Sequence, residues 1–347
     1  MGLYCKKEFP MADKEINKAP KPLPLWLLLP LDAILLAFCL LTFAYFHHVN
    51  PIGGDVSPVQ SAKASYSTKY MKESDEKTKP GFAEKWKNLF TEGGEPVVTE
   101  NSYQSEDINI QISDQKIGNS VYYIADIHVR YVNNFRSAFG SVDENGKDLY
   151  ALGKSSLSSA SDIISRTNAV LAINGDYYGA RENGYVYRNF TLYRDVPRAD
   201  VGAFYADGTF RNFEKAAFDL EEETKNGLYH IMGFEPSLVV GGKALTGYNG
   251  SIASANPRSG FGYYEPGHYC FVVADGRQEE YSVGPTIDEF AAFFESFGVQ
   301  EAFNLDGGKS SQMYFMGNLV NKPDGYKGTP GSLRQLTDMF YIGEVQE

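Results

Sequence analysis

Residues 302–311 read AFNLDGGKSS, a short apolar run that leads directly into a loop of acidic, glycine, lysine and serine residues. Strands that end in polar loops present reactive groups on a rigid scaffold. This loop combines a carboxylate, backbone N–H groups, hydroxyls and a cation, which suits an anion held beside a general acid or base. The competing interpretation is ordinary turn chemistry, because Asp-Gly is among the commonest tight turns.

Two other segments have the same organisation. Residues 169–178 read AVLAINGDYY and residues 270–277 read CFVVADGR, so each apolar strand again opens into an Asn-Gly or Asp-Gly turn. Taken singly, each turn is explained by local backbone chemistry. Three such strand ends in one domain make a shared site a reasonable hypothesis.

Short β-branched and aromatic runs dominate the chain from about residue 102 onward. Two helices interrupt them, at about 158–166 and at 285–297, where Thr286 and Glu289 form a capping box. The combination predicts an α+β domain with a mixed or antiparallel sheet and flanking helices. The predicted strands are 121–132, 169–173, 201–205, 238–240, 260–264, 269–274 and 312–315.

An apolar segment precedes this domain. Residues 25–46 read LWLLLPLDAILLAFCLLTFAYF, which as a helix is about 33 Å long and predicts one transmembrane helix. Five lysines precede it and none follows until Lys63, so the positive-inside rule places the N-terminus in the cytoplasm. We therefore expect a cytoplasmic N-terminus at 1–24, a transmembrane signal anchor at 25–46, an extracytoplasmic stalk at 47–100, and an extracytoplasmic domain at 101–347 of a single-pass cell-membrane protein.

Composition limits the partners of that domain. The formal net charge of the chain is −12, which argues against nucleic acid as a partner and requires a local cluster of donors for any phosphate-bearing substrate. Only one cysteine, Cys270, follows the apolar segment, so the domain cannot form an internal disulfide. The Ser-, Lys- and Glu-rich stalk suggests a linker, with a short amphipathic helix at 82–90.

Several linked motifs resemble the phosphodiester glycosidase family. Residues 304–311 are similar to its N-L-D-G-G-G-S-S/T signature, with Lys309 in place of the third glycine. Residues 174–178 resemble its N-G-G-F/Y-F segment, with Asp176 in place of the second glycine. Further matches, in the family's order, are PRSGFG at 257–262, DGR at 275–277, GPTIDEF at 284–290 and the closing segment at 317–323.

The resemblance implies hydrolysis of a sugar-1-phosphodiester, with the bond at the anomeric carbon broken and a phosphomonoester left behind. Together with the membrane anchor, this predicts a surface glycopolymer or glycolipid with sugar-phosphate links as the substrate. It makes Asp306 the first choice for the catalytic carboxylate and Asp176 its partner, since two carboxylates flanking the bond are usual in glycoside cleavage. The substrate- or phosphate-binding candidates are Arg258, Arg277, Lys309, Ser310, Ser311, Asn174, Asn304, Gly307 and Gly308.

Other interpretations of these residues stay open. Arg277 could simply pair with Asp275 in a turn. No cofactor is required by the motifs, although Asp176 and Asp306 are hard ligands suited to Ca²⁺ or Mg²⁺. The histidines at 128, 230 and 268 show no zinc spacing. The tyrosines at 177, 178, 263 and 264 could stack on sugar rings or simply pack in the core.

Two other functions also fit the sequence. One is a non-catalytic protein that binds polysaccharide or assists exopolysaccharide biosynthesis through the same cleft. The other is cleavage at phosphorus, which would leave the phosphate on the sugar fragment. The products of the reaction distinguish these alternatives from a glycosidase.

Overall fold

The computed structural model describes residue 36 and residues 84–345. The predicted membrane span and most of the predicted stalk lie outside the described residues. Among the residues that are described, no helix has both the length and the apolar character needed to cross a membrane. The elements named below all lie in the unit Ile52–Glu347.

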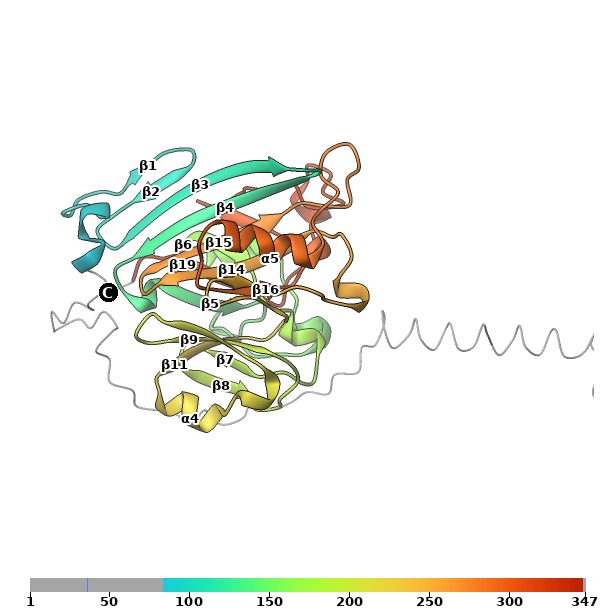
Figure 1. Ribbon diagram of the computed structural model, residues 1–347. Helices are drawn as coiled ribbons and strands as arrows, with labels where there is room; N and C mark the ends of the chain where they lie inside the picture. The colour runs from blue at the N-terminus through green and yellow to red at the C-terminus, as the bar shows by residue number, and fades with distance from the viewer. Residues whose placement is uncertain (1–35, 37–83, 346–347) are drawn as a thin grey trace, which may run out of the picture. The chain divides into compact units, whose positions relative to one another are not determined.

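The largest sheet has nine strands in the order β1-β2-β3-β4-β15-β14-β16-β12-β13. In chain order the strands are β1 Val97–Val98, β2 Ser102–Gln104, β3 Ile108–Ile117, β4 Ser120–Val129, β12 Ser237–Val240, β13 Lys243–Ala244, β14 Arg258–Glu265, β15 His268–Ala274 and β16 Glu301–Leu305. The long hairpin of β3 and β4 forms one side of this sheet (Figure 1). Its two-residue turn begins at Gly118, whose φ of +56° suits glycine.

Smaller sheets complete the β structure. A five-stranded sheet has the order β18-β17-β6-β19-β5, a three-stranded sheet the order β10-β9-β11, and β7 pairs with β8. The strands are β5 Phe135–Phe139, β6 Ala169–Asn174, β7 Val186–Arg188, β8 Thr191–Arg194, β9 Val201–Tyr205, β10 Phe210–Phe213, β11 Leu228–Met232, β17 Met313–Phe315, β18 Asn318–Leu319 and β19 Asp338–Gly343. Every strand pairing within the described residues is antiparallel, so the sheets are antiparallel rather than mixed.

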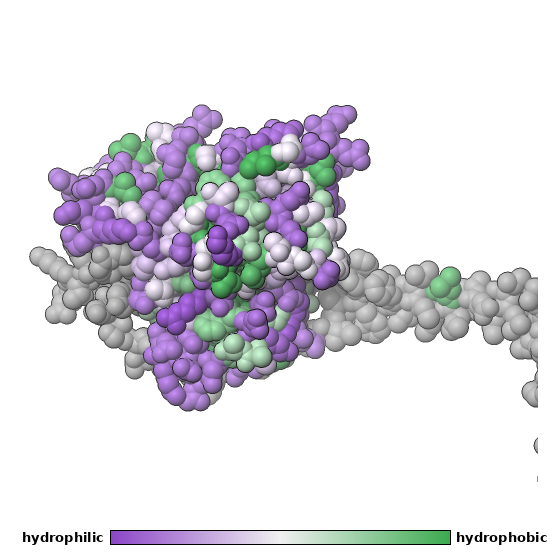
Figure 2. Space-filling model, in the orientation of Figure 1, coloured by the Kyte–Doolittle hydropathy of each residue, from purple (hydrophilic) through white to green (hydrophobic). Residues whose placement is uncertain are grey.

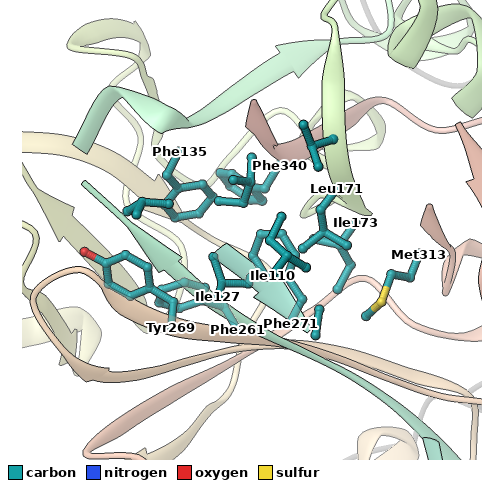
Figure 3. Close-up of a cluster of buried hydrophobic side chains, with 14 of the residues drawn as sticks. Ile110, Ile127, Phe135, Leu171, Ile173, Phe261, Tyr269, Phe271, Met313 and Phe340 are labelled. Atoms are coloured by element: carbon teal, nitrogen blue, oxygen red, sulfur yellow. The ribbon is translucent and has the colours of Figure 1, made fainter. Parts of the chain in front are cut away.

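The main core is rich in aromatic side chains and draws on strands of the three larger sheets (Figure 3). Phe135 of β5 is at its centre, with ring centroids 4.9 Å from Phe204 of β9 and 5.5 Å from Phe261 of β14. It also lies 5.9 Å from Phe340 of β19. Because one ring contacts strands of all three sheets, burial of this cluster fixes the sheets against one another.

Helix α5, Ile287–Ser296, covers the other face of the nine-stranded sheet (Figure 1). Its N-terminus confirms the predicted capping box, because Thr286 accepts from the Glu289 N–H while Glu289 reaches back to the Thr286 N–H. Glycines let the helix approach β14 closely. A Cβ at Gly260 or Gly262 would lie 2.9 Å from the Phe294 ring, so two glycines of the PRSGFG motif serve packing.

The remaining helical elements are short. Helix α3 is Ala160–Ser165, within the predicted 158–166, and α4 is Leu220–Lys225, which the sequence analysis missed. The strand predicted at 121–132 ends at Val129. The helix predicted near 82–90 includes, in its described part, only two helical residues at 84–85 and the 3-10 turn Lys87–Leu89. In Figure 2 the periphery of this face is mainly hydrophilic, and less polar and apolar residues gather across its middle.

Candidate active site

Asn174, the last residue of β6, joins the ends of strands from two sheets. Its Nδ2 donates to the Asp306 carbonyl at 2.7 Å, and its Oδ1 accepts from the Ser259 hydroxyl at 2.7 Å. The Gln312 N–H also donates to Oδ1. Asn174 is 1% exposed. A buried amide with all of these partners aligns the loop after β6 with the loop after β16, as the sequence analysis required for a shared site.

Asp306 lies next to this amide and is partly buried. Its N–H donates to the Gly175 carbonyl at 3.1 Å, so its position is fixed by the neighbouring loop. Burial raises the pKa of the Asp306 carboxyl from 3.8 to about 6, although the Ser310 hydroxyl and the guanidinium groups of Arg334 and Arg181 oppose the rise. A carboxyl with a pKa near 6 exists in both protonation states at neutral pH, as acid–base catalysis requires.

The positive charges of two arginines, Arg181 and Arg334, which no sequence motif singles out, lower the pKa of this carboxyl. Arg181 follows the 3-10 turn Tyr178–Ala180, and burial, followed by the neighbouring Arg198, lowers its pKa while Asp176 and Asp306 raise it. Arg334 is exposed and lies 4.9 Å over the Tyr177 ring. Neither arginine lies in a recognisable motif, so only the fold reveals that both act electrostatically on Asp306.

Asp176 occupies a different environment from Asp306. It is 2% exposed, and its Oδ2 accepts from Arg188 Nη2 and from the Gly233 N–H, each at 2.8 Å. Arg188 also donates to Asp338 Oδ2 at 3.1 Å, which forms a buried Asp-Arg-Asp triad. Burial, reinforced by Asp176, raises the pKa of Asp338 to about 6.

A small cavity adjoins the triad. Its volume is about 10 Å³, and Asp176, Arg181 and Gly233 contribute to its lining. The Oδ1 atom of Asp176 is buried and has no hydrogen-bond partner among the described residues. A space of this size is near the minimum for one water molecule. Asp176 is therefore held in place by Arg188 and the Gly233 N–H, and it is more buried than Asp306.

The two glycines after Asp306 allow the loop to close against the segment before β14. A Cβ at Gly307 would lie 2.8 Å from the Pro257 carbonyl oxygen. The Gly308 N–H donates to that same oxygen at 2.9 Å, and Gly308 has a φ of +63°. The DGG sequence is thus required by backbone geometry, which brings this loop and the PRSGFG motif together.

The predicted phosphate-binding arginines have other partners. Arg258 is 3% exposed and its Nη2 donates to the carbonyls of Ile252 and Ser254, both at 2.6 Å. Burial and the neighbouring Arg277 lower its pKa to about 10. Arg277 is exposed, and it bonds Asn256 Oδ1 at 2.9 Å rather than Asp275.

Arg277 nonetheless stays near the glycine loop. Its guanidinium lies 3.2–3.6 Å from where a Gly308 Cβ would stand. Asp275 is fully buried and instead binds Asn321, the Lys322 N–H and Tyr281. The turn alternative for Arg277 is therefore wrong, and the second predicted loop contributes an arginine to the rim of the site.

The other candidates lie around the same loop. Lys309 is exposed, and its Nζ lies 3.7 Å from where a Gly325 Cβ would stand, so the side chain points toward the 323–328 loop. Ser310 and Ser311 are buried, with Ser310 beside Asp306. Asn304 donates to the Glu235 carbonyl at 2.8 Å, which holds a neighbouring loop in place.

Metal ligands are not gathered at Asp306. Within the described residues, the cluster of His, Cys, Asp and Glu whose ligand atoms lie within 4.8 Å of one another is Asp126, His128 and His268, on β4 and β15. Asp176 and Asp306 are not part of it. Of the four tyrosines suggested to bind sugar, Tyr178 is buried in a core cluster, whereas Tyr177 is partly exposed beside Arg334.

Comparisons with known proteins found a curated relative, similar solved structures and a family match. The chain is 30% identical over 168 residues to the SPbeta prophage-derived uncharacterized protein YomE of Bacillus subtilis (strain 168), a match that covers 45% of this chain and 26% of that protein. The chain therefore spans about a quarter of the length of this relative.

Two solved structures share the fold at low sequence identity. The catalytic domain of zebrafish N-acetylglucosamine-1-phosphodiester alpha-N-acetylglucosaminidase, auto-inhibited by its pro-peptide, gives a TM-score of 0.52 at 16% identity, covering 82% of this chain and 100% of that one. A hypothetical protein from Synechocystis gives 0.51 at 13% identity, covering 72% and 64%.

The family model for phosphodiester glycosidases matches residues 167–343, just over half of the chain. The match begins just before β6 and ends at the last residue of β19. It therefore includes Asn174, Asp306 and both arginines that act electrostatically on Asp306. The chain belongs to the phosphodiester glycosidase family.

Proposed function

We propose that this chain hydrolyses a sugar-1-phosphodiester, releasing the free sugar and a phosphomonoester. The observation that carries the proposal is Asp306 in the glycine-rich loop of the family signature. Its carboxyl has a pKa of about 6, and the positive charges of Arg181 and Arg334 act on it. A proton donor next to cationic side chains is what cleavage between an anomeric carbon and a phosphate oxygen needs.

Asp306 supplies the proton in this mechanism. As the bond between C1 and the bridging oxygen breaks, the protonated carboxyl gives its proton to that oxygen, which stays with phosphorus. Water adds its hydroxyl to C1 and its second proton returns to the Asp306 carboxylate. One water is consumed, and the sugar and phosphomonoester account for all of its atoms.

Arg181 and Arg334 hold the phosphate in the proposal. Both act electrostatically on the Asp306 carboxyl, which supports placing the phosphate on the same side of the site as that carboxyl. A guanidinium fork matches two phosphate oxygens, and the local positive charge offsets a net charge of −12 that would otherwise repel the substrate. Arg277, at the rim, is placed to contact the group beyond the phosphate.

The anchor and the substrate are linked in the proposal. The apolar segment at 25–46 and the lysines before it favour a domain held outside the cytoplasm. We therefore place the substrate among surface glycopolymers or glycolipids with sugar-phosphate links. An enzyme fixed at the membrane meets such substrates at high local concentration.

The test is product analysis with the full-length chain. A panel of sugar-1-phosphodiesters is incubated in ¹⁸O-water and the products are identified by mass spectrometry. Unlabelled phosphomonoester released together with free sugar supports cleavage at C1, whereas label in the phosphate would mean attack at phosphorus. Asp306→Asn is expected to lower turnover by roughly 10²–10⁴-fold, while Asp114→Asn, an exposed carboxylate on β3, serves as the matched control.

The arginines have a separate test. Arg181→Ala is expected to raise KM and lower kcat/KM, whereas Arg211→Ala, an exposed arginine on β10, leaves both unchanged. The main alternative is a non-catalytic glycan-binding protein. It predicts saturable binding of the panel with no product, and Asp306→Asn would then change the affinity alone.

A further inference from the structure

Two histidines face each other on the outer surface of the nine-stranded sheet. His128 of β4 and His268 of β15 are directly opposite partners in the antiparallel pair. Tyr122 and Ile124 of β4 pack beneath α5 on this surface. Since side chains alternate along a strand, Asp126 and His128 continue the same face beyond the helix.

The three polar side chains converge at that point. Asp126 Oδ1 lies 2.7 Å from His268 Nε2, and Asp126 Oδ2 lies 3.8 Å from His128 Nδ1. The two imidazole rings stack with centroids 4.0 Å apart, and one ligand atom from each of the three residues lies within 4.8 Å of the others. Donors bound to one small ion at about 2.0–2.2 Å are roughly 3–3.6 Å apart, so small side-chain rotations suffice.

Two aromatic side chains, Trp86 and Tyr264, pack against the imidazoles of the Asp126, His128 and His268 cluster. Trp86 meets both imidazoles edge-on, with centroids 4.7 Å from His128 and 5.4 Å from His268, and its Nε1 donates to the Pro266 carbonyl at 3.2 Å. Tyr264 stacks on His268 at 4.1 Å. His128 is 7% exposed, whereas the Asp126 side chain is 45% exposed. The cluster is therefore enclosed on most sides and open to solvent beside the carboxylate.

We propose that Asp126, His128 and His268 form a binding site for one divalent transition-metal ion of the Zn²⁺ class, with water as the fourth ligand on the side of Asp126. Two imidazoles and one carboxylate favour such an ion over Ca²⁺ or Mg²⁺, which prefer oxygen donors. Trp86 and Tyr264 contact the imidazoles and limit their movement.

The protonation state of the cluster agrees with this proposal. Burial, followed by the neighbouring His268, lowers the pKa of His128 to about 4. The His128 ring is therefore neutral at pH 7 and keeps a lone pair for an ion.

This site is distinct from the candidate active site and does not depend on the proposed function. Its ligands come from β4 and β15, whereas Asp306 follows β16. The sequence showed no zinc spacing because His128 and His268 are 140 positions apart and come together only when β4 pairs with β15. A bound ion would join these strands and fix Trp86, and hence the 84–90 segment, against the sheet.

The test is metal binding by the full-length chain. The protein is stripped with a chelator and titrated with Co²⁺, whose visible absorption reports nitrogen and oxygen ligands in a site of low coordination number, and Zn²⁺ is then added in competition. We expect one ion per chain. Asp126→Asn and His268→Ala are each expected to weaken binding by roughly tenfold or more.

A matched control and a second readout keep the test decisive. His47→Ala/His48→Ala removes the adjacent histidines outside the described residues and is expected to leave the affinity unchanged. Zn²⁺ is expected to raise the thermal midpoint of the unaltered chain more than that of Asp126→Asn at the same concentration, and this variant preserves side-chain shape. The proposal is overturned if the chain binds neither ion, or if both ligand variants retain full affinity.

Discussion

The side-chain amide of Asn174 donates a 2.7 Å hydrogen bond to the main-chain carbonyl of Asp306, across the junction of two sheets. The same side chain accepts from Ser259 and Gln312. The buried Asn174 amide thus holds the main chain at Asp306, where the chain leaves β16. Replacing Asn174 by a side chain of the same shape without the N–H donor tests whether this hydrogen bond is needed for stability and turnover.

Asn174→Asp is expected to destabilise the fold and lower turnover together. An aspartate retains the two acceptor contacts but loses the donor to the Asp306 carbonyl and brings a second negative charge near Asp306. Leaving a buried group unsatisfied costs about 1–3 kcal/mol. Chemical denaturation measures the loss, and Asn318→Asp, at an exposed asparagine of β18, is the control. Equal stability of the two variants would contradict a positioning role.

The activity is expected to fall as the pH rises through about 6. The Asp306 pKa is raised to about 6, so the protonated acid that the mechanism uses disappears above that value. A pH profile of kcat/KM measures this limb. If kcat/KM instead rises through the same range, the carboxylate is the active form and the acid role is wrong.

Asp306→Asn is expected to stabilise the folded chain at neutral pH. Because burial raises the folded-state pKa from 3.8 to about 6, the folded chain binds this proton more tightly, and stability is lost as the pH rises between those values. Asparagine does not titrate and avoids that loss. A shift of about two pKa units corresponds to about 3 kcal/mol, so we expect a gain of up to roughly 6–12 °C in the thermal midpoint at pH 8. The gain should vanish near pH 4, and a gain independent of pH would contradict the explanation.

Gly307→Ala is expected to abolish turnover. Contacts that the substrate makes with residues outside this loop are expected to change little. The new Cβ would lie 2.8 Å from the Pro257 carbonyl oxygen, and a main-chain atom cannot move away as a side chain can. The loop must therefore shift and carry Asp306 with it. Gly331→Ala, where no atom lies within 4 Å of the Cβ position, is the control for the measured kcat.

Arg188→Met is expected to destabilise the chain by about 3–5 kcal/mol, because it leaves two buried carboxylates without their cation. Arg188 bonds Asp176 at 2.8 Å and Asp338 at 3.1 Å. A double-mutant cycle with Asp338→Asn measures the coupling by denaturation. Purely additive losses would show that the triad does not act as a unit.

Local patterns in the sequence predicted the features that local chemistry determines. The capping box at Thr286 and Glu289 fixed the start of α5, and the alternating runs located strands such as β9 and β15. The strand-to-loop pattern also identified the turns at Asn174 and Asp306, which the fold brings together. The antiparallel arrangement throughout the described residues was one of two alternatives that composition left open.

The rest of the site depends on long-range packing. Arg181 and Arg334 lie in loops without a motif, and they act on Asp306 only because distant strands meet. Arg258 fitted a phosphate by residue type, but its guanidinium holds the loop before β14 instead. His128 and His268 are 140 positions apart, so no spacing rule relates them until β4 pairs with β15.

Trp86 gives this fold an optical signal of its own. The chain has two tryptophans, and Trp86 is in edge contact with both imidazoles of the His128 and His268 pair. An indole in that position senses the charge of the rings beside it, since a protonated or metal-bound imidazole quenches its fluorescence differently from a neutral one. With Trp26 replaced by phenylalanine, emission from the unlabelled chain would follow the state of that sheet surface in real time.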